Sequence, residues 1–267
     1  MARQRVDLFR AQMAAGKLIQ EFAFSRPEQI IVEDVAMARK VLVIDDVLHG
    51  AEARLLRDGQ SGLIRVQAAI PEEGRRRYAI AHELGHWELH VDTSQWNFCT
   101  KADLLTMKQY KGSPLEMEAN AFASHLLMPR AIFAPHCKEV APSLKAIIDL
   151  AAAFRTTLTA TSVRFVEECE EVCAVVFSEN GKIKWWHARE DSDFWIEPGK
   201  PLDRRTEAWE CQNGGMASTK MEPVKPEYWL DELPRGRKTE VFEQAMKLGT
   251  YPTVLTLLWI VEAENDE

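Results

Sequence analysis

The sequence has no apolar run that could cross a membrane. No stretch of its 267 residues approaches the roughly 18 consecutive apolar residues that a membrane-spanning helix requires. The N-terminal segment is interrupted by Arg10, Lys17 and Glu21, so it lacks the apolar centre of a secretory signal. We therefore expect a cytoplasmic protein with no membrane association.

The sequence also lacks a disulfide framework. Its five cysteines are an odd number at unmatched spacings, which is typical of reduced thiols in a cytosolic protein. Cys169 and Cys173 lie four residues apart on a predicted helix. No second Cys or His pair accompanies them, so they do not form the four-ligand set of a structural zinc site.

Clustered positive charge is missing as well. Residues 1–130 contain 17 Lys and Arg and 17 Asp and Glu, whereas residues 131–267 contain 16 and 24. The net charge of −8 therefore lies in the second half. Because a nucleic-acid surface needs clustered positive charge, we expect no direct nucleic-acid binding.

One stretch, residues 78–90, carries most of the chemical information. It reads Tyr-Ala-Ile-Ala-His-Glu-Leu-Gly-His-Trp-Glu-Leu-His and contains the pattern H-E-x-x-H. Positions i and i+4 of an α-helix lie on one face, so His82 and His86 can direct two imidazole nitrogens at one point. Two such nitrogens suit a tetrahedral zinc ion. Glu83 projects beside that face, where it can accept a proton from an attacking water.

The same stretch has an apolar face. Ile80, Leu84, Trp87 and Val91 recur at i, i+4, i+7 and i+11, a spacing that buries one side of a helix. The two histidines lie off this stripe, on a flank that we expect to face a cleft. The alternative is a pair of histidines on a solvated helix face without a metal.

The chain has no H-E-x-x-H-x-x-G-x-x-H pattern, because no glycine follows His86 at the required place. His90 extends the series by four residues, but His82 and His90 are separated by about 12 Å along a helix axis. Zinc–nitrogen bonds are only about 2 Å long. We therefore expect His90 to lie at the helix end or beside a ligand, and the third ligand to come from elsewhere.

A second helix offers carboxylates for that place. Ser113 and Pro114 predict its start, and it ends at Met128 before a proline. Glu116 and Glu118 lie on opposite flanks of its apolar stripe, and either could be the third ligand. The alternatives are a capping-box role for Glu116 and a solvated charge for Glu118, and spacing alone leaves these possibilities open.

These two segments together resemble a known family. Residues 75–86, Arg-Arg-Arg-Tyr-Ala-Ile-Ala-His-Glu-Leu-Gly-His, and residues 116–129, Glu-Met-Glu-Ala-Asn-Ala-Phe-Ala-Ser-His-Leu-Leu-Met-Pro, are similar to the ImmA/IrrE zinc metallopeptidases. The resemblance covers about residues 25–135. It implies that Zn²⁺ is held by His82, His86 and Glu116, that Glu83 is catalytic, and that Asn120 hydrogen-bonds a ligand histidine.

The resemblance also implies an activity and a partner. The expected activity is zinc-dependent endopeptidase cleavage of a helix-turn-helix transcriptional repressor, in a stress or mobile-element response. An oxyanion-stabilising donor is expected too, with Tyr78, Tyr110 and His125 as candidates. An alternative is a zinc-binding anti-repressor that acts by protein–protein contact without cleavage. A purely structural zinc domain is disfavoured, because structural sites use four protein ligands.

The chain as a whole is predicted to be an α+β protein in three parts. Residues 1–130 form a zincin-like peptidase domain with helices over 6–24 and 28–40, a strand at 42–44 and a hairpin of 51–57 and 62–68. Residues 131–170 form a helical connector with helices over 142–154 and 158–169, resembling a helix-turn-helix segment of some IrrE-type proteins. Residues 92–112 are expected to be a polar connection beside the cleft.

Residues 171–267 form a C-terminal α/β domain, in the place where similar IrrE-type proteins carry a GAF-like sensor. Strands are expected over 173–177, 182–187, 239–248 and 253–261. Six tryptophans fall in this part and are interpreted either as the lining of a ligand pocket or as a half-buried core: Trp185, Trp186, Trp195, Trp209, Trp229 and Trp259.

Overall fold

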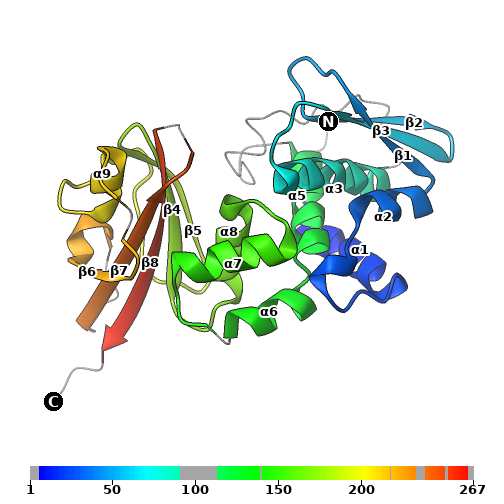
Figure 1. Ribbon diagram of the computed structural model, residues 1–267. Helices are drawn as coiled ribbons and strands as arrows, with labels where there is room; N and C mark the ends of the chain where they lie inside the picture. The colour runs from blue at the N-terminus through cyan, green and yellow to red at the C-terminus, as the bar shows by residue number, and fades with distance from the viewer. Residues whose placement is uncertain are drawn as a thin grey trace. The chain divides into compact units, whose positions relative to one another are not determined.

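The computed structural model describes residues 6–90, 113–138, 140–216, 218–232, 238–249 and 252–263. The chain divides into two compact units (Figure 1). The first comprises residues 1–133 and 151–157, and the second comprises residues 134–150 and 158–267. Within the described residues, no helix is both long enough and apolar enough to span a bilayer. The predicted domain boundaries after residues 130 and 170 stay predictions.

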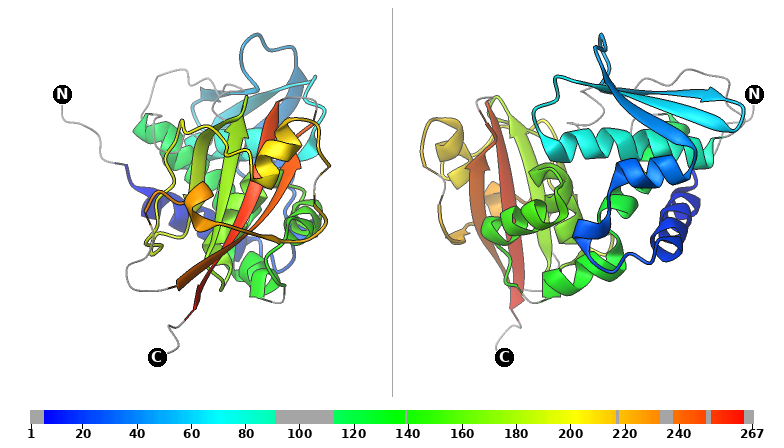
Figure 2. Two further views of the ribbon diagram at one scale, coloured as in Figure 1. Left: turned by 90° about the vertical axis from the view of Figure 1, so that its left-hand side faces the viewer. Right: turned by 45° about the vertical axis from the view of Figure 1, so that its right-hand side comes forward.

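The first unit combines helices with a three-stranded sheet. Its elements are α1 (Leu8–Glu21), η1 (Pro27–Gln29), α2 (Val32–Ala38), β1 (Val41–Asp46), β2 (Ala53–Asp58), β3 (Ser61–Gln67), α3 (Glu73–Leu89) and α5 (Pro114–Leu127). The central strand β3 runs parallel to β1 and antiparallel to β2. Helix α3 lies against the sheet and beside α5, and α1 packs on α5 (Figures 1 and 2).

The hairpin of β2 and β3 follows from alternating burial. Ile64 and Val66 are fully buried, while Leu63 and Arg65 between and beside them are partly exposed. A two-residue period of this kind places one face of a strand on the core. The predicted hairpin is therefore confirmed, and its buried face is the surface on which α3 lies.

The predicted helix over 28–40 is wrong in its first half. The structure has the short η1 and then α2, separated by Ile30 and Ile31, whose backbones are not helical. The side chain of Gln29 accepts hydrogen bonds from the backbone N–H groups of Ser25 and Arg26, at 2.8 and 2.9 Å. These bonds stabilise a local turn, and the fully buried Ile30 anchors it to the core.

The second unit is built on a five-stranded antiparallel sheet in the order β5-β4-β8-β7-β6. Helices α6 (Arg130–Lys138) and α7 (Leu144–Phe154) each have residues in both units. The remaining elements are α8 (Leu158–Glu168), β4 (Cys173–Glu179), β5 (Lys182–Ala188), α9 (Glu207–Gln212), β6 (Glu222–Val224), η2 (Pro226–Tyr228), β7 (Lys238–Lys247) and β8 (Thr253–Ala263). Helix α8 contacts β4 and β5, and α9 contacts β7 and β8 (Figure 2).

The strands of this sheet confirm the four that the sequence predicts. Asn180 and Gly181 join β4 to β5 with φ angles of 52° and 72°. Two successive positive φ values define the tight turn that matches strand twist, and Asn-Gly is its preferred pair. Helix α9 and strand β6 have no predicted counterpart. The mixed α+β class is confirmed, whereas the GAF-like and helix-turn-helix-like assignments stay predictions.

Candidate metal centre

The two motif histidines lie one turn apart on α3, with their Nε2 atoms 3.1 Å from each other. His82 is fully buried and His86 is 3% exposed. The alternative of two histidines on a solvated helix face is therefore wrong. The apolar stripe is confirmed as far as the structure describes it, since Ile80 and Leu84 are fully buried, and its last predicted member, Val91, falls outside the described residues.

Glu116 reaches both histidines from α5. Its carboxylate oxygens lie 3.1 Å from His82 Nε2 and 3.3 Å from His86 Nε2. Ligand atoms of these three residues all lie within 4.8 Å of one another, the one such cluster found among the described residues. Ser113 caps the helix by accepting from the Glu116 backbone N–H, at 3.4 Å, while the Glu116 side chain turns to the histidines.

Asn120 fixes the orientation of His82. The Asn120 Oδ1 atom lies 2.8 Å from His82 Nδ1 and accepts a second hydrogen bond from the Tyr78 hydroxyl at 3.0 Å. Because an amide oxygen only accepts, this contact places a proton on Nδ1 of His82. The Nε2 lone pair of neutral His82 then points to the place where Glu116 and His86 also converge.

This arrangement fits a bound cation. Acceptor atoms of His82, His86 and Glu116 converge at 3.1–3.3 Å, a spacing that needs a proton or a metal ion between them. In the absence of an ion, a proton shared between these acceptor atoms can hold them together. Burial lowers the pKa of His82, but the hydrogen bond to Glu116 and the charges of Glu83 and Glu116 together outweigh burial and raise that pKa. Burial conversely raises the pKa of Glu116, and both histidines bring it below its usual range.

Glu83 is a buried carboxyl without a well-formed hydrogen bond to any described residue. The side chain is fully buried, and neither of its oxygens has a partner of ordinary hydrogen-bond geometry. Burial and the charge of Glu116 raise its pKa to about 7, against opposing contributions from His82 and the backbone of Leu55. An orphaned buried carboxyl is costly, and such costs are concentrated at functional sites. A pKa near neutrality suits a group that takes up and returns a proton.

Close packing of α3 on α5 brings the two halves of the site together. A Cβ atom at Gly85 would lie 3.0 Å from Ala119 Cα and 3.2 Å from the Phe122 ring. The absence of a side chain at Gly85 therefore lets α5 approach α3 closely. In sequence, Ala119 lies between Glu116 and Asn120, the two α5 residues that contact His82. The close approach of the helices at Gly85 therefore sets the distance from these two side chains to His82.

We expect Gly85→Val to weaken metal binding. The added branched side chain must push α5 outward, which lengthens the path from Glu116 to both histidines. The expected loss in zinc affinity is about tenfold or more, measured by competition with a chromophoric chelator. The matched control is Gly16→Val, at a helical glycine whose Cβ position has no described atom within 4 Å, and it should bind zinc as wild type does.

His90 and Glu118 form a second buried pair beside the site. His90 ends α3, as expected from the sequence, and its Nδ1 atom lies 2.9 Å from Nδ1 of His86. Its Nε2 atom lies 3.0 Å from Glu118 Oε2. The interpretation of Glu118 as a solvated charge is wrong, because the residue is only 3% exposed.

The candidates for an oxyanion donor have separate outcomes. The Tyr78 hydroxyl donates to Asn120 and therefore lies next to His82. His125 donates from Nδ1 to the Ala121 carbonyl, one turn back on its own helix, at 2.9 Å. Tyr110 lies outside the described residues. The assignment of this donor stays a prediction.

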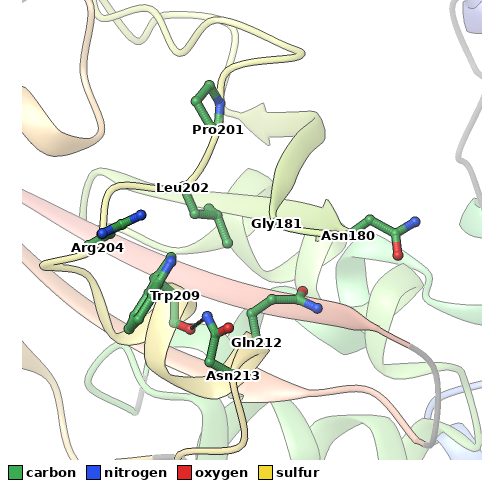
Figure 3. Close-up of a pocket in the computed structure, with 8 residues that line it drawn as sticks. All are labelled: Asn180, Gly181, Pro201, Leu202, Arg204, Trp209, Gln212 and Asn213. Atoms are coloured by element: carbon green, nitrogen blue, oxygen red, sulfur yellow. Dashed lines mark hydrogen bonds between the residues drawn. The ribbon is translucent and has the colours of Figure 1, made fainter.

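Three of the six tryptophans of the second unit belong to its core or pack against it. Trp229 is 1% exposed and donates to the buried Glu243 at 2.8 Å, and Trp186 packs on the same cluster. Trp195, by contrast, is 48% exposed. Trp209 also packs on the core and lines a surface hollow of about 490 Å³ beside the β4–β5 turn (Figure 3).

Comparisons with known proteins agree with the site. The family model described as the IrrE N-terminal-like domain, of a peptidase family, matches residues 36–165. No curated protein matches the chain. Among solved structures, a Mycobacterium tuberculosis transcriptional regulator is similar with a TM-score of 0.59 and 15% identity, over 94% of this chain and 88% of that one. At this identity the likeness shows the fold alone.

The matched residues include every member of the candidate site. His82, Glu83 and His86 on α3 and Glu116 and Asn120 on α5 all fall within residues 36–165. Residues 36–165 therefore form an IrrE N-terminal-like domain, which confirms the resemblance of the two motifs to the ImmA/IrrE family.

Proposed function

We propose that this chain is a zinc-dependent endopeptidase that cleaves a helix-turn-helix transcriptional repressor. The observation that carries the peptidase activity is Glu83, a fully buried carboxyl beside a His-His-Glu cluster. Its oxygens have no hydrogen-bond partner of ordinary geometry in the part of the chain that the structure describes. A protein that only binds a metal or a partner has no use for such a group. The membership of residues 36–165 in a peptidase family supports the same conclusion.

His82, His86 and Glu116 would hold the zinc. Two imidazoles with one carboxylate are a donor set of catalytic zinc, whereas structural zinc uses four protein ligands, mostly cysteines. When bound, zinc supplies a Lewis acid that polarises the scissile carbonyl and acidifies water. Asn120 and Tyr78 keep the lone pair of His82 directed at the site.

Glu83 would move the proton in both halves of the reaction. It takes a proton from the attacking water as that water adds to the carbonyl carbon of the peptide bond. It then gives this proton to the leaving amine as the carbon–nitrogen bond breaks. A carboxyl whose pKa lies near 7 can both accept and return a proton at neutral pH.

The repressor as substrate is supported by the family resemblance and by charge. A DNA-binding repressor carries clustered positive charge. This chain has a net charge of −8, all of it from residues 131–267, and would therefore attract such a partner. The same contact without cleavage would make the chain an anti-repressor. The two candidate functions differ in one observable: the first leaves a cut repressor and the second leaves an intact one.

Metal removal tests the activity. Purified chain should cleave a helix-turn-helix repressor, first that encoded beside its own gene, only when zinc is bound. Treatment with a chelator should abolish the fragments on a gel, and added zinc should restore them. Magnesium added to the chelated protein serves as a control and should restore nothing. Undiminished cleavage by protein shown to be free of metal would contradict the proposal.

A further inference from the structure

We propose that His90 and Glu118 are positioning residues that hold His86 in its metal-binding tautomer. They do so through a chain of buried hydrogen bonds that ends on the backbone of Asp7. This inference rests on the metal site proposed above. It concerns how tightly that site holds a cation and not whether the chain cleaves a peptide. This inference and the proposed peptidase function can therefore fail separately.

The hydrogen-bond chain is continuous from the cluster to α1. His86 Nδ1 lies 2.9 Å from His90 Nδ1, and His90 Nε2 lies 3.0 Å from Glu118 Oε2. The other carboxylate oxygen of Glu118 accepts from the backbone N–H of Asp7 at 2.9 Å. His86, His90 and Glu118 are 3%, 7% and 3% exposed, so these bonds are largely removed from water.

Metal binding allows only one arrangement of protons along this chain. To offer the Nε2 lone pair to a cation, His86 must carry its proton on Nδ1 and donate it to His90. His90 Nδ1 must then be an acceptor, which leaves the His90 proton on Nε2. That proton is donated to Glu118, whose second oxygen already accepts from Asp7. In this arrangement each donor along the chain meets an acceptor, and each bond supports the tautomer before it.

The two histidines of the cluster are thus held by different acceptors. His82 donates to the neutral amide oxygen of Asn120, whereas His86 reaches a carboxylate through a second imidazole. A carboxylate behind a ligand histidine raises the basicity of that ligand. Burying an unpaired carboxylate is costly, and Glu118 is kept buried where it accepts from His90 and from the main chain.

The first turn of α1 fixes the far end of the chain. Asp7 caps α1 by accepting from the backbone N–H of Arg10 at 2.9 Å. The Arg10 guanidinium in turn donates to the carbonyl of Leu89, the last residue of α3, at 2.6 Å. Asp7 and Arg10 therefore hold Glu118 and the end of α3 that carries His90. Each of these two contacts joins residues more than 70 positions apart in sequence.

Zinc affinity of the full chain, measured by competition with a chromophoric chelator, tests the inference. The variants are Glu118→Gln, His90→Leu, His90→Asn and the double variant of His90→Leu with Glu118→Gln. Loss of a residue behind a ligand typically weakens metal binding by about 10–100-fold. We expect a loss in this range for His90→Leu and about tenfold for Glu118→Gln.

Two results distinguish positioning from a structural role. An Asn side chain offers an oxygen near the place of Nδ1, so His90→Asn should recover at least part of the affinity that His90→Leu loses. In the proposed chain Glu118 reaches His86 through His90, so the double variant should bind zinc within about twofold of His90→Leu alone. Thermal unfolding of the metal-free variants by circular dichroism records any loss of fold separately.

The second unit offers a matched control. His187 and Glu167 form a similar His–Glu pair, with 2.9 Å between His187 Nε2 and Glu167 Oε1, and neither residue belongs to the His82, His86 and Glu116 cluster. His187→Leu and Glu167→Gln should therefore bind zinc as wild type does. His82→Ala should bind weakly and shows that the assay detects loss of a ligand.

Three outcomes overturn the inference. The first is wild-type zinc affinity in every His90 and Glu118 variant. The second is a double variant whose loss of zinc affinity equals the product of the two single losses. The third is an equal loss of zinc affinity in His90→Asn and His90→Leu. In each case a weak His82→Ala variant shows that the metal site itself stands. If wild type and His82→Ala bind zinc equally, the proposed metal site fails and this inference fails with it.

Discussion

Glu83→Gln is expected to keep its zinc and its fold while cleavage falls by about 10²–10⁴-fold. General acid–base catalysis contributes a factor of this size, and an amide cannot accept the proton of the attacking water. Glu83 is not a member of the metal cluster. Among the described residues neither of its oxygens has a hydrogen-bond partner of ordinary geometry, so the isosteric amide breaks no well-formed bond and the unfolding temperature should not fall. The measurements are zinc content, thermal unfolding and initial cleavage rate.

The matched control for this variant is Glu88→Gln on the same helix. Glu88 pairs with Arg39 at 3.3 Å and does not belong to the cluster. Its replacement should leave both zinc content and cleavage rate near those of wild type. A Glu83→Gln protein that cleaves at a rate close to that of wild type would remove Glu83 from the mechanism.

Glu116→Ala is expected to lose tight zinc binding, and Glu118→Ala to lose less. Glu116 contacts both histidines of the cluster, whereas Glu118 contacts His90 and acts at one remove. Loss of a direct ligand should exceed the factor of about 10–100 that is typical of a residue behind a ligand. Metal analysis after dialysis against a weak chelator ranks the two variants.

The opposite ranking would reverse the assignment of the third ligand. If Glu116→Ala retained its zinc and Glu118→Ala released it, the cluster seen in the structure would not be the metal site. Thermal unfolding of both metal-free variants is the control. Glu118 is 3% exposed and its removal leaves His90 without its carboxylate, so a loss of stability there must be separated from a loss of metal.

Local signals explain why much of the site could be predicted from sequence. The spacing of His82 and His86 places them on one helical face whatever surrounds the helix. Ser113 and Pro114 define the start of α5 by capping and by a fixed φ, and the structure begins that helix at Pro114. These features depend on neighbours in sequence, which is where single-sequence reasoning is strongest.

Features that depend on packing could not be predicted in the same way. The choice between Glu116 and Glu118 depends on how α5 turns against α3, and that is set by the contact of Gly85 with Ala119. The bond from Asp7 to Glu118 joins residues 111 positions apart. No periodicity or spacing within either segment carries such information.

Short or interrupted elements were also beyond the sequence pattern. Helix α9 has six residues, too few for a helical period, and is recognisable mainly by Thr206 capping it at 3.2 Å. The division between η1 and α2 falls at Ile30 and Ile31, whose backbones are not helical. Features of this length carry no helical period from which they could be predicted.

We propose that this chain inactivates a repressor by cutting it. The most direct measurement incubates a repressor–operator complex with wild type or with Glu83→Gln, both loaded with zinc. Intact-mass spectrometry then follows the repressor chain, and a mobility-shift assay follows the operator DNA. We predict two repressor fragments and free operator with wild type, and an intact repressor on its operator with Glu83→Gln. Release of an uncut repressor by both proteins would contradict the claim and establish the chain as an anti-repressor.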